Sequence, residues 1–292
     1  MPEYEGVVIR PPSEADSLIL QYTIGCSHNG CIFCPAYKEK HYRVRSLAEM
    51  EQDIRSCLPA CGDTERIFLA DGDALGAPLS ELLALAQLLR SSFPRLRRIG
   101  MYANAKNILG RSVEELRQLQ EAGIGILYVG IESGDDDLLT WMSKGATAAD
   151  MAEAGRRVKE AGIKLSVTVL LGIGGIDRSE KHAWLTGKLL TAIDPEYVGA
   201  LTTMVVQGTP LYELQQRGRF SLPSPFVILS ELAEMLEHTE MTRGLFFANH
   251  ASNYLPIRVR MPSQRDRTVA MIREFIRQGD ASVLRPDGMR RL

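Results

Sequence analysis

The sequence predicts an α/β fold: a partial (β/α)6 TIM-like barrel followed by a C-terminal, mostly helical extension. Short apolar, β-prone segments alternate with helix-length segments in which apolar residues recur at helical spacing. Helix-length spacers between buried strands imply parallel strands and right-handed crossovers. The alternation yields about six β/α units, fewer than the eight of a closed barrel, and this favours an open or partial barrel.

The elements follow in order. The predicted strands are apolar runs, and they cover Ser17–Thr23, Arg66–Ala70, Arg98–Ala103, Ile124–Ile131, Lys164–Leu171 and Tyr197–Val205. The predicted helices between them cover Leu47–Pro59, Leu79–Leu89, Val113–Ala122, Ala148–Ala161 and Glu180–Ile193. Gly123 and Gly162 provide stop signals for two of these helices.

The alternation stops after Thr209 and Pro210. Two further helices are predicted over Leu229–Glu240 and Arg265–Gln278, on either side of the polar segment Ala248–Tyr254. We therefore predict a core barrel over residues 1–209 and an extension over residues 210–292 that caps it.

Composition excludes several classes of protein. The chain has 292 residues, of which 45% are hydrophobic and 24% are charged, and this indicates a globular protein. A net charge of −2 disfavours a dedicated nucleic-acid coat or a polybasic membrane binder. Because the chain has no run of about 18 apolar residues and no signal-peptide pattern at its start, we expect a cytoplasmic protein without membrane partners.

All five cysteines lie in the first quarter of the chain, which does not resemble a disulfide framework. Three of them form the pattern Cys26-x4-Cys31-x2-Cys34 directly after the first predicted strand. Three thiolates suit a [4Fe–4S] cluster with one iron left open. The alternatives are structural cysteines or a zinc site completed by His28. Cys57 and Cys61 share an apolar helical stripe and are expected to be core thiols.

The cysteine loop, with Phe33 directly before Cys34, resembles that of the radical S-adenosylmethionine (radical SAM) superfamily. The resemblance implies that Cys26, Cys31 and Cys34 hold a [4Fe–4S] cluster, and that SAM binds the open iron through its amino and carboxylate groups. It also implies reductive cleavage of SAM to a 5′-deoxyadenosyl radical that abstracts hydrogen from a substrate. The usual first gap has three residues, so this loop carries one extra residue.

Further motifs at the ends of predicted strands extend the resemblance over residues 15–210. Asp71, Gly72 and Asp73 match the position of the family's glycine-rich motif at the SAM amino group, although an ordinary Asp/Gly turn is the alternative. Glu132 and Ser133 follow the fourth strand, where relatives place a polar or acidic residue on SAM.

The remaining matches are weaker when taken alone. Gly172 lies in a glycine stretch that in relatives passes beside adenine, and Arg156 lies on a helix that often carries a basic partner for the SAM carboxylate. Asn104, Ser166 and Thr168 are expected to line the mouth of the barrel.

The whole pattern is similar to the oxygen-independent coproporphyrinogen oxidase-like and Elongator-type branch of the superfamily. The chain has no cysteine after Cys61 that could hold an auxiliary cluster, and it has no cobalamin motif. The resemblance implies an enzyme of oxidoreductase or methyltransferase type acting on a small or medium organic substrate, with flavodoxin or ferredoxin as electron donor. The alternatives are a non-enzymatic iron–sulfur or zinc protein acting as chaperone or sensor, and a tRNA-modifying enzyme. The charge balance disfavours nucleic acid as a partner.

The polar segment Ala248–Tyr254 follows the apolar residues 245–247. Placed polar groups in an otherwise apolar pocket are typical of substrate sites, whereas an ordinary surface loop is the alternative. We predict that this segment covers the barrel mouth and that His250 and Tyr254 are catalytic residues in contact with substrate.

Overall fold

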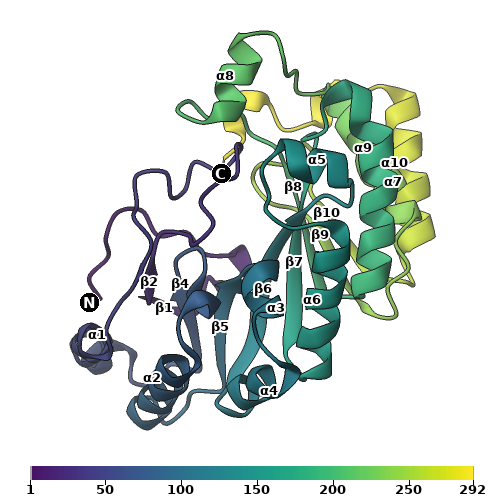
Figure 1. Ribbon diagram of the computed structural model, residues 1–292. Coiled ribbons are helices and arrows are strands. Elements are labelled where there is room, and N and C mark those ends of the chain that lie inside the picture. Colours follow the sequence, from purple (N-terminus) through teal and green to yellow (C-terminus); the bar gives the residue numbers. More distant parts are fainter. Residues whose placement is uncertain (1, 292) are drawn as a thin grey trace. The chain divides into compact units, whose positions relative to one another are not determined.

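A computed structural model describes residues 2–291, and within them the chain forms two compact units (Figure 1). The first unit contains the residues through Asn29 together with Ala36–Val129 and Arg156–Leu165. The second contains Gly30–Pro35, Gly130–Gly155 and the described residues from Ser166 onward. The cysteine loop is therefore shared, because Cys26 belongs to the first unit whereas Cys31 and Cys34 belong to the second.

Parallel strands form the centre of the first unit. In sheet order they are β1 (Leu18–Gln21), β4 (Arg66–Ala70), β5 (Arg98–Ala103) and β6 (Ile124–Glu132). A short antiparallel ribbon of β2 (Thr23–Ile24) and β3 (Arg43–Val44) brackets the cysteine loop in the sequence. The helices of this unit are α1 (Leu47–Cys61), α2 (Leu79–Ser92), α3 (Ala105–Leu109) and α4 (Val113–Glu121).

Local sequence explains where these helices begin and which face they bury. Ser46 and Ser112 each accept a hydrogen bond from the backbone three residues ahead, and Glu49 and Glu115 return it, so both helices start with a capping box. In α1 the buried residues include Met50, Ile54 and Cys57, which recur at helical spacing. The Cys57 thiol is fully buried, as expected for a core residue.

The second unit is built on β7 and the strands that follow it. The strands β7 (Lys164–Leu171), β8 (Tyr197–Thr202) and β9 (Gly244–Ala248) pair in parallel, and β10 (Ile257–Met261) pairs antiparallel with β9. Its helices are α5 (Asp136–Trp141), α6 (Ala148–Glu160, which continues into the first unit), α7 (Gly175–Ile193), α8 (Pro210–Gln216), α9 (Pro225–Glu237) and α10 (Arg265–Gln278). Helices α7, α9 and α10 lie side by side (Figure 1).

Short 3-10 helices complete the described elements; they cover Pro12–Glu14, Ala74–Gly76, Ala281–Val283 and Asp287–Met289. Within residues 2–291 the structure contains no helix that is both long enough and apolar enough to cross a membrane.

The predicted fold class is confirmed, and β4, β5, β7 and α10 have the predicted bounds. The extension differs in detail, because it contributes the strands β9 and β10 as well as helices. The sequence predicts no strand at residues 245–247, but in the structure these residues pair in parallel with β8, which lies about 48 positions earlier in the sequence. The division of the chain at residue 209 stays a prediction.

Candidate functional site

The start of the cysteine loop is fixed to the segment that follows β4. The Gly25 N–H donates to Asp71 Oδ2 at 3.0 Å, and the Gly72 N–H donates to the Gly25 carbonyl at 3.1 Å. Gly25 has a φ of 76°, a conformation that glycine adopts without steric cost. These reciprocal contacts determine where the backbone of Cys26 lies.

The second half of the loop is held by backbone contacts in the second unit. The Ile32 N–H donates to the Met142 carbonyl at 3.1 Å, and the Ile32 carbonyl accepts from the Leu211 N–H at 3.0 Å. Ile32 lies between Cys31 and Cys34, so the end of α5 and the beginning of α8 fix the loop from both sides. Cys31, Phe33 and Cys34 are half-buried.

Asp71 is a fully buried carboxylate that organises its neighbours. Its Oδ2 accepts from Gln21 Nε2 at 3.0 Å, from the Gly25 N–H and from Lys40 Nζ at 2.7 Å. Asp71 Oδ1 is also buried, and no residue within 2–291 donates a hydrogen bond to it. The contacts of Asp71 fix the backbone of Gly25, at the start of the cysteine loop.

Asp73 is also fully buried, but it is surrounded by neutral donors. Its Oδ2 accepts from Asn104 Nδ2 at 2.8 Å and from Ser27 Oγ and Asn107 Nδ2. Burial raises the pKa of Asp73 to about 6, although these hydrogen bonds act in the opposite direction. Asp73 Oδ1 is buried and receives no hydrogen bond from residues 2–291.

Gly72 lies directly against the cysteine loop. A Cβ at this position would come within 2.6 Å of Tyr37 Cε2 and 2.9 Å of Cys26 Cβ. Only glycine therefore allows the backbone before Asp73 to approach Cys26 this closely.

Asn104 has two functions in this region. It caps α3 by accepting the Asn107 N–H at 2.8 Å on Oδ1, which leaves its amide nitrogen to donate to Asp73. Sequence reasoning identified Asn104 but missed Ser27 and Asn107. The start of a helix at Asn104 is the signal that could have identified Asn107.

Glu132, in the second unit, is paired with a lysine, whereas Asp73 has only neutral hydrogen-bond donors. The φ of Glu132 is 63°, in the left-handed region, and its Oε1 accepts from Lys144 Nζ at 2.9 Å. Both side chains are almost buried, with 8% and 14% of their surfaces exposed. A strained backbone that presents a charged side chain is typical of functional positions. Lys144 was not identified from the sequence.

The turn after β7 is held by a buried acid from the extension. The Gly172 N–H donates to Glu231 Oε1 at 2.6 Å, and Ser179 Oγ donates to Oε2 at 2.6 Å. Glu231 Oε1 also lies 3.6 Å from His182 Nε2, and His182 Nδ1 is hydrogen-bonded to Ser133 Oγ at 2.7 Å. Burial raises the pKa of Glu231. Sequence reasoning missed Glu231; an acid on the apolar face of α9 is the signal that could have identified it.

The other predicted cofactor residues have ordinary surroundings. Arg156 is exposed and pairs with Glu160 at 2.6 Å, whereas Arg157 donates to the carbonyls of Leu109 and Arg111. Ser166 and Thr168 are half-buried on the same face of β7. None of these contacts tests the roles that the resemblance implies, so those roles stay predictions.

Tyr254 and His250 lie among the C-terminal residues. Tyr254 is buried; its hydroxyl donates to Asp287 Oδ1 at 2.7 Å and accepts from Arg290 Nη1 at 2.7 Å. His250 Nδ1 lies 3.0 Å from Ser252 Oγ, and burial together with the nearby Arg285 lowers the pKa of His250. The Tyr254 hydroxyl thus anchors the end of the chain, and the catalytic role of both residues stays a prediction.

The donor set in this part of the chain fits the predicted cofactors. Three half-buried thiols lie on one short loop, and thiolates are the ligands of iron–sulfur clusters. Asp73 follows Gly72, which lies against Cys26, and its bare Oδ1 provides a buried acceptor suited to an ammonium group.

Comparison with known proteins agrees with this reading. The model of the Radical SAM superfamily matches residues 20–184, more than half of the chain. The heme chaperone HemW of Bacillus subtilis is 25% identical over 207 residues, covering 68% of this chain and 53% of that protein. A tRNA-2-methylthio-N(6)-dimethylallyladenosine synthase of Dehalococcoides mccartyi is 28% identical over 198 residues, covering 66% and 46%. The chain thus spans about half the length of these curated relatives.

Solved structures share the fold. The cobalamin-dependent SAM radical enzyme OxsB superposes with a TM-score of 0.59 at 17% identity, over 76% of this chain and 41% of that chain. Coproporphyrinogen III oxidase (HemN) from Escherichia coli gives a TM-score of 0.56 at 15% identity, over 77% and 52%. The predicted membership of the superfamily is confirmed by the family model, and the similarity to HemW agrees with the predicted branch. The chain belongs to the radical SAM superfamily, whose cofactors are a [4Fe–4S] cluster and SAM.

Proposed function

We propose that this protein is a radical SAM enzyme that cleaves SAM reductively and abstracts a hydrogen atom from a small or medium organic substrate. The observation that carries the proposal is Asp73: a buried carboxylate with one bare oxygen, three neutral donors on the other, and a glycine before it that lies against Cys26. When bound, the cluster and SAM supply the electron transfer and the radical chemistry.

The residues of the chain supply binding and orientation. We assign cluster ligation to Cys26, Cys31 and Cys34, whose thiolates are the expected ligands. Asp73 accepts the SAM ammonium on Oδ1, while Ser27, Asn104 and Asn107 hold its Oδ2 in place. Because these three partners are neutral, the charge of Asp73 is left for a cationic ligand.

Asp71 acts through the loop itself. Its hydrogen bond from the Gly25 N–H and its ion pair with Lys40 fix the backbone that carries Cys26. Glu132, Ser133 and Gly172 are proposed as further SAM contacts at the ends of β6 and β7, in line with the family resemblance. An electron donor of the flavodoxin or ferredoxin kind is the proposed partner.

The test is anaerobic reconstitution followed by an assay of SAM cleavage. The proposal expects about four irons per chain and dithionite-dependent release of 5′-deoxyadenosine. Asp73→Asn should keep the iron and reduce release at subsaturating SAM, whereas the exposed control Asp63→Asn should behave as wild type. Full iron content without any release of 5′-deoxyadenosine would overturn the proposal.

A second candidate is a non-enzymatic chaperone, and the similarity to the heme chaperone HemW favours it. In that case the cluster would assemble and SAM would bind without being consumed. The same assay separates the two functions, because only the enzyme consumes SAM and releases 5′-deoxyadenosine.

A further inference from the structure

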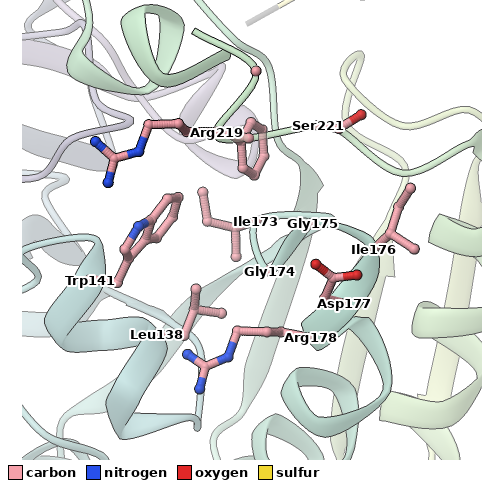
Figure 2. A pocket seen from close by; sticks show the side chains of 12 residues that line it. Leu138, Trp141, Ile173, Gly174, Gly175, Ile176, Asp177, Arg178, Arg219 and Ser221 are labelled. Atoms are coloured by element: carbon pink, nitrogen blue, oxygen red, sulfur yellow. The ribbon is translucent and has the colours of Figure 1, made fainter.

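A cleft of about 380 Å³ opens in the second unit (Figure 2). Its walls come from α5, from the first turn of α7 and from residues 218–221 between α8 and α9. Helix α5 follows β6, and the turn before α7 follows β7, so the cleft opens at the carboxyl ends of these strands. Ligands of barrel proteins bind at this end.

One wall of the cleft is formed by Trp141, whose ring packs against Phe220. Trp141 is 38% exposed, and its ring is stacked on Phe220 with centroids 5.9 Å apart and planes 28° apart. Phe220 and Leu138 are themselves buried. Trp141 therefore offers a rigid, flat apolar surface to a ligand at a low cost in conformational entropy.

The Trp141 end of the cleft carries two positively charged side chains, Arg178 and Arg219. Figure 2 shows the guanidinium groups of Arg219 and Arg178 at the same end as the Trp141 ring, and Asp177 toward the other end. Arg178 pairs with Asp137 at 2.8 Å. Arg219 is exposed, and nothing between residues 2 and 291 forms an ion pair or hydrogen bond with its guanidinium.

A glycine keeps the cleft open. Gly175 has a φ of 63°, which strains other residues, and a Cβ there would lie 3.4 Å from the Ser221 carbonyl oxygen and 3.8 Å from Phe220 Cε2. A side chain at this position would occupy the space between the turn and residues 218–221.

We propose that this cleft binds a flat aromatic ring that carries an anionic group, with the ring stacked on Trp141 and the anion paired with Arg219. Arginine pairs well with carboxylate and phosphate groups, and an aromatic ring gains from stacking on the exposed indole. The volume of the cleft, about 380 Å³, suits one bicyclic ring with a substituent. The cleft includes Gly174 and Gly175, which follow the proposed SAM contact Gly172, but the binding proposed here needs neither the cluster nor SAM cleavage.

The experiment uses 1-naphthoate as the probe and the full chain labelled with ¹⁵N. The chain has two tryptophans, so the indole N–H of Trp141 reports on the cleft, and that of Trp184, which is outside its lining, is an internal control. We expect a saturable shift of the Trp141 resonance alone. The neutral 1-naphthalenemethanol and the non-aromatic cyclohexanecarboxylate should bind at least about tenfold more weakly.

Three variants test the assignment of charge. Arg219→Ala should weaken naphthoate binding by about tenfold or more, while Arg217→Ala, an exposed neighbour paired with Glu213, should leave it unchanged. Asp177→Asn should keep or tighten binding, because it removes a negative charge. An unshifted Trp184 resonance shows that each variant is folded. Lack of saturation, equal binding of 1-naphthalenemethanol, or equal loss in Arg217→Ala would overturn the proposal.

Discussion

Asp73 and Glu132 both resemble SAM-binding acids, but their surroundings differ. Asp73 is surrounded by neutral donors and keeps one oxygen bare, whereas Glu132 is already paired with Lys144 at 2.9 Å. A carboxylate without a cation is unstable when buried and gains most from a positively charged ligand. A carboxylate with a lysine partner gains less, because a new cation would compete with the lysine. The two acids should therefore respond differently to the same changes.

The largest effect is expected from the cysteines of the loop. Cys26→Ala, Cys31→Ala and Cys34→Ala should each abolish cluster binding, since the proposed cluster has only these three thiolate ligands. Cys57→Ala and Cys61→Ala are the controls, and they should keep the visible iron–sulfur absorption. Equal loss in all five variants would show that the loop has no special role.

Removing the partner of Glu132 should destabilise the fold. Lys144→Met leaves a nearly buried carboxylate without its cation and should lower the free energy of unfolding by about 3 kcal/mol, measured by urea denaturation. The control is Arg117→Met, because Arg117 is 44% exposed and pairs with the exposed Glu114 at 2.7 Å. That variant should lose less than about 1 kcal/mol. Similar losses in both variants would mean that the nearly buried Glu132–Lys144 pair stabilises the fold no more than an exposed ion pair does.

Asp73 should make the stability of the protein depend on pH, because burial raises the pKa of its carboxyl group. Its folded pKa of about 6 lies above the ordinary value of 3.8, so its protonated form favours the folded state. The stability it contributes is complete below about pH 4 and is lost as pH rises toward 6, by up to about 3 kcal/mol. In urea titrations without SAM, the free energy of unfolding of Asp73→Asn should therefore rise relative to that of wild type as the pH is raised across this range. A constant difference from pH 4 to pH 6.5 contradicts the assignment.

The smallest effect concerns affinity for SAM and compares the acids directly. Asp73→Ala should keep the cluster and weaken SAM binding by about tenfold to a hundredfold, because a charge-assisted hydrogen bond is lost. Glu132→Ala should also weaken binding, but by less than Asp73→Ala. Equilibrium binding of SAM to the reconstituted protein measures both. If Glu132→Ala proves the more damaging, the neutral surroundings of Asp73 do not mark the ammonium site.

The alternation of strands and helices, the cysteine loop and the positions of Asp71, Asp73 and Glu132 could be predicted from the sequence alone. These features are local: apolar period, glycine stops and residue spacing are written along the chain. The bounds of β4, β5, β7 and α10 follow from such signals without tertiary information.

The contacts between these groups depend on the folded chain and could not be predicted from the sequence. Asn107 reaches Asp73, Leu211 reaches the cysteine loop, and Glu231 reaches Gly172 across 59 positions of sequence. β9 likewise became a strand by pairing with β8. Such contacts depend on the packing of distant segments, and each buried polar group must find its partner there because burial removes water. No local pattern specifies that partner, so the surroundings that distinguish Asp73 from Glu132 could be seen only in the folded chain.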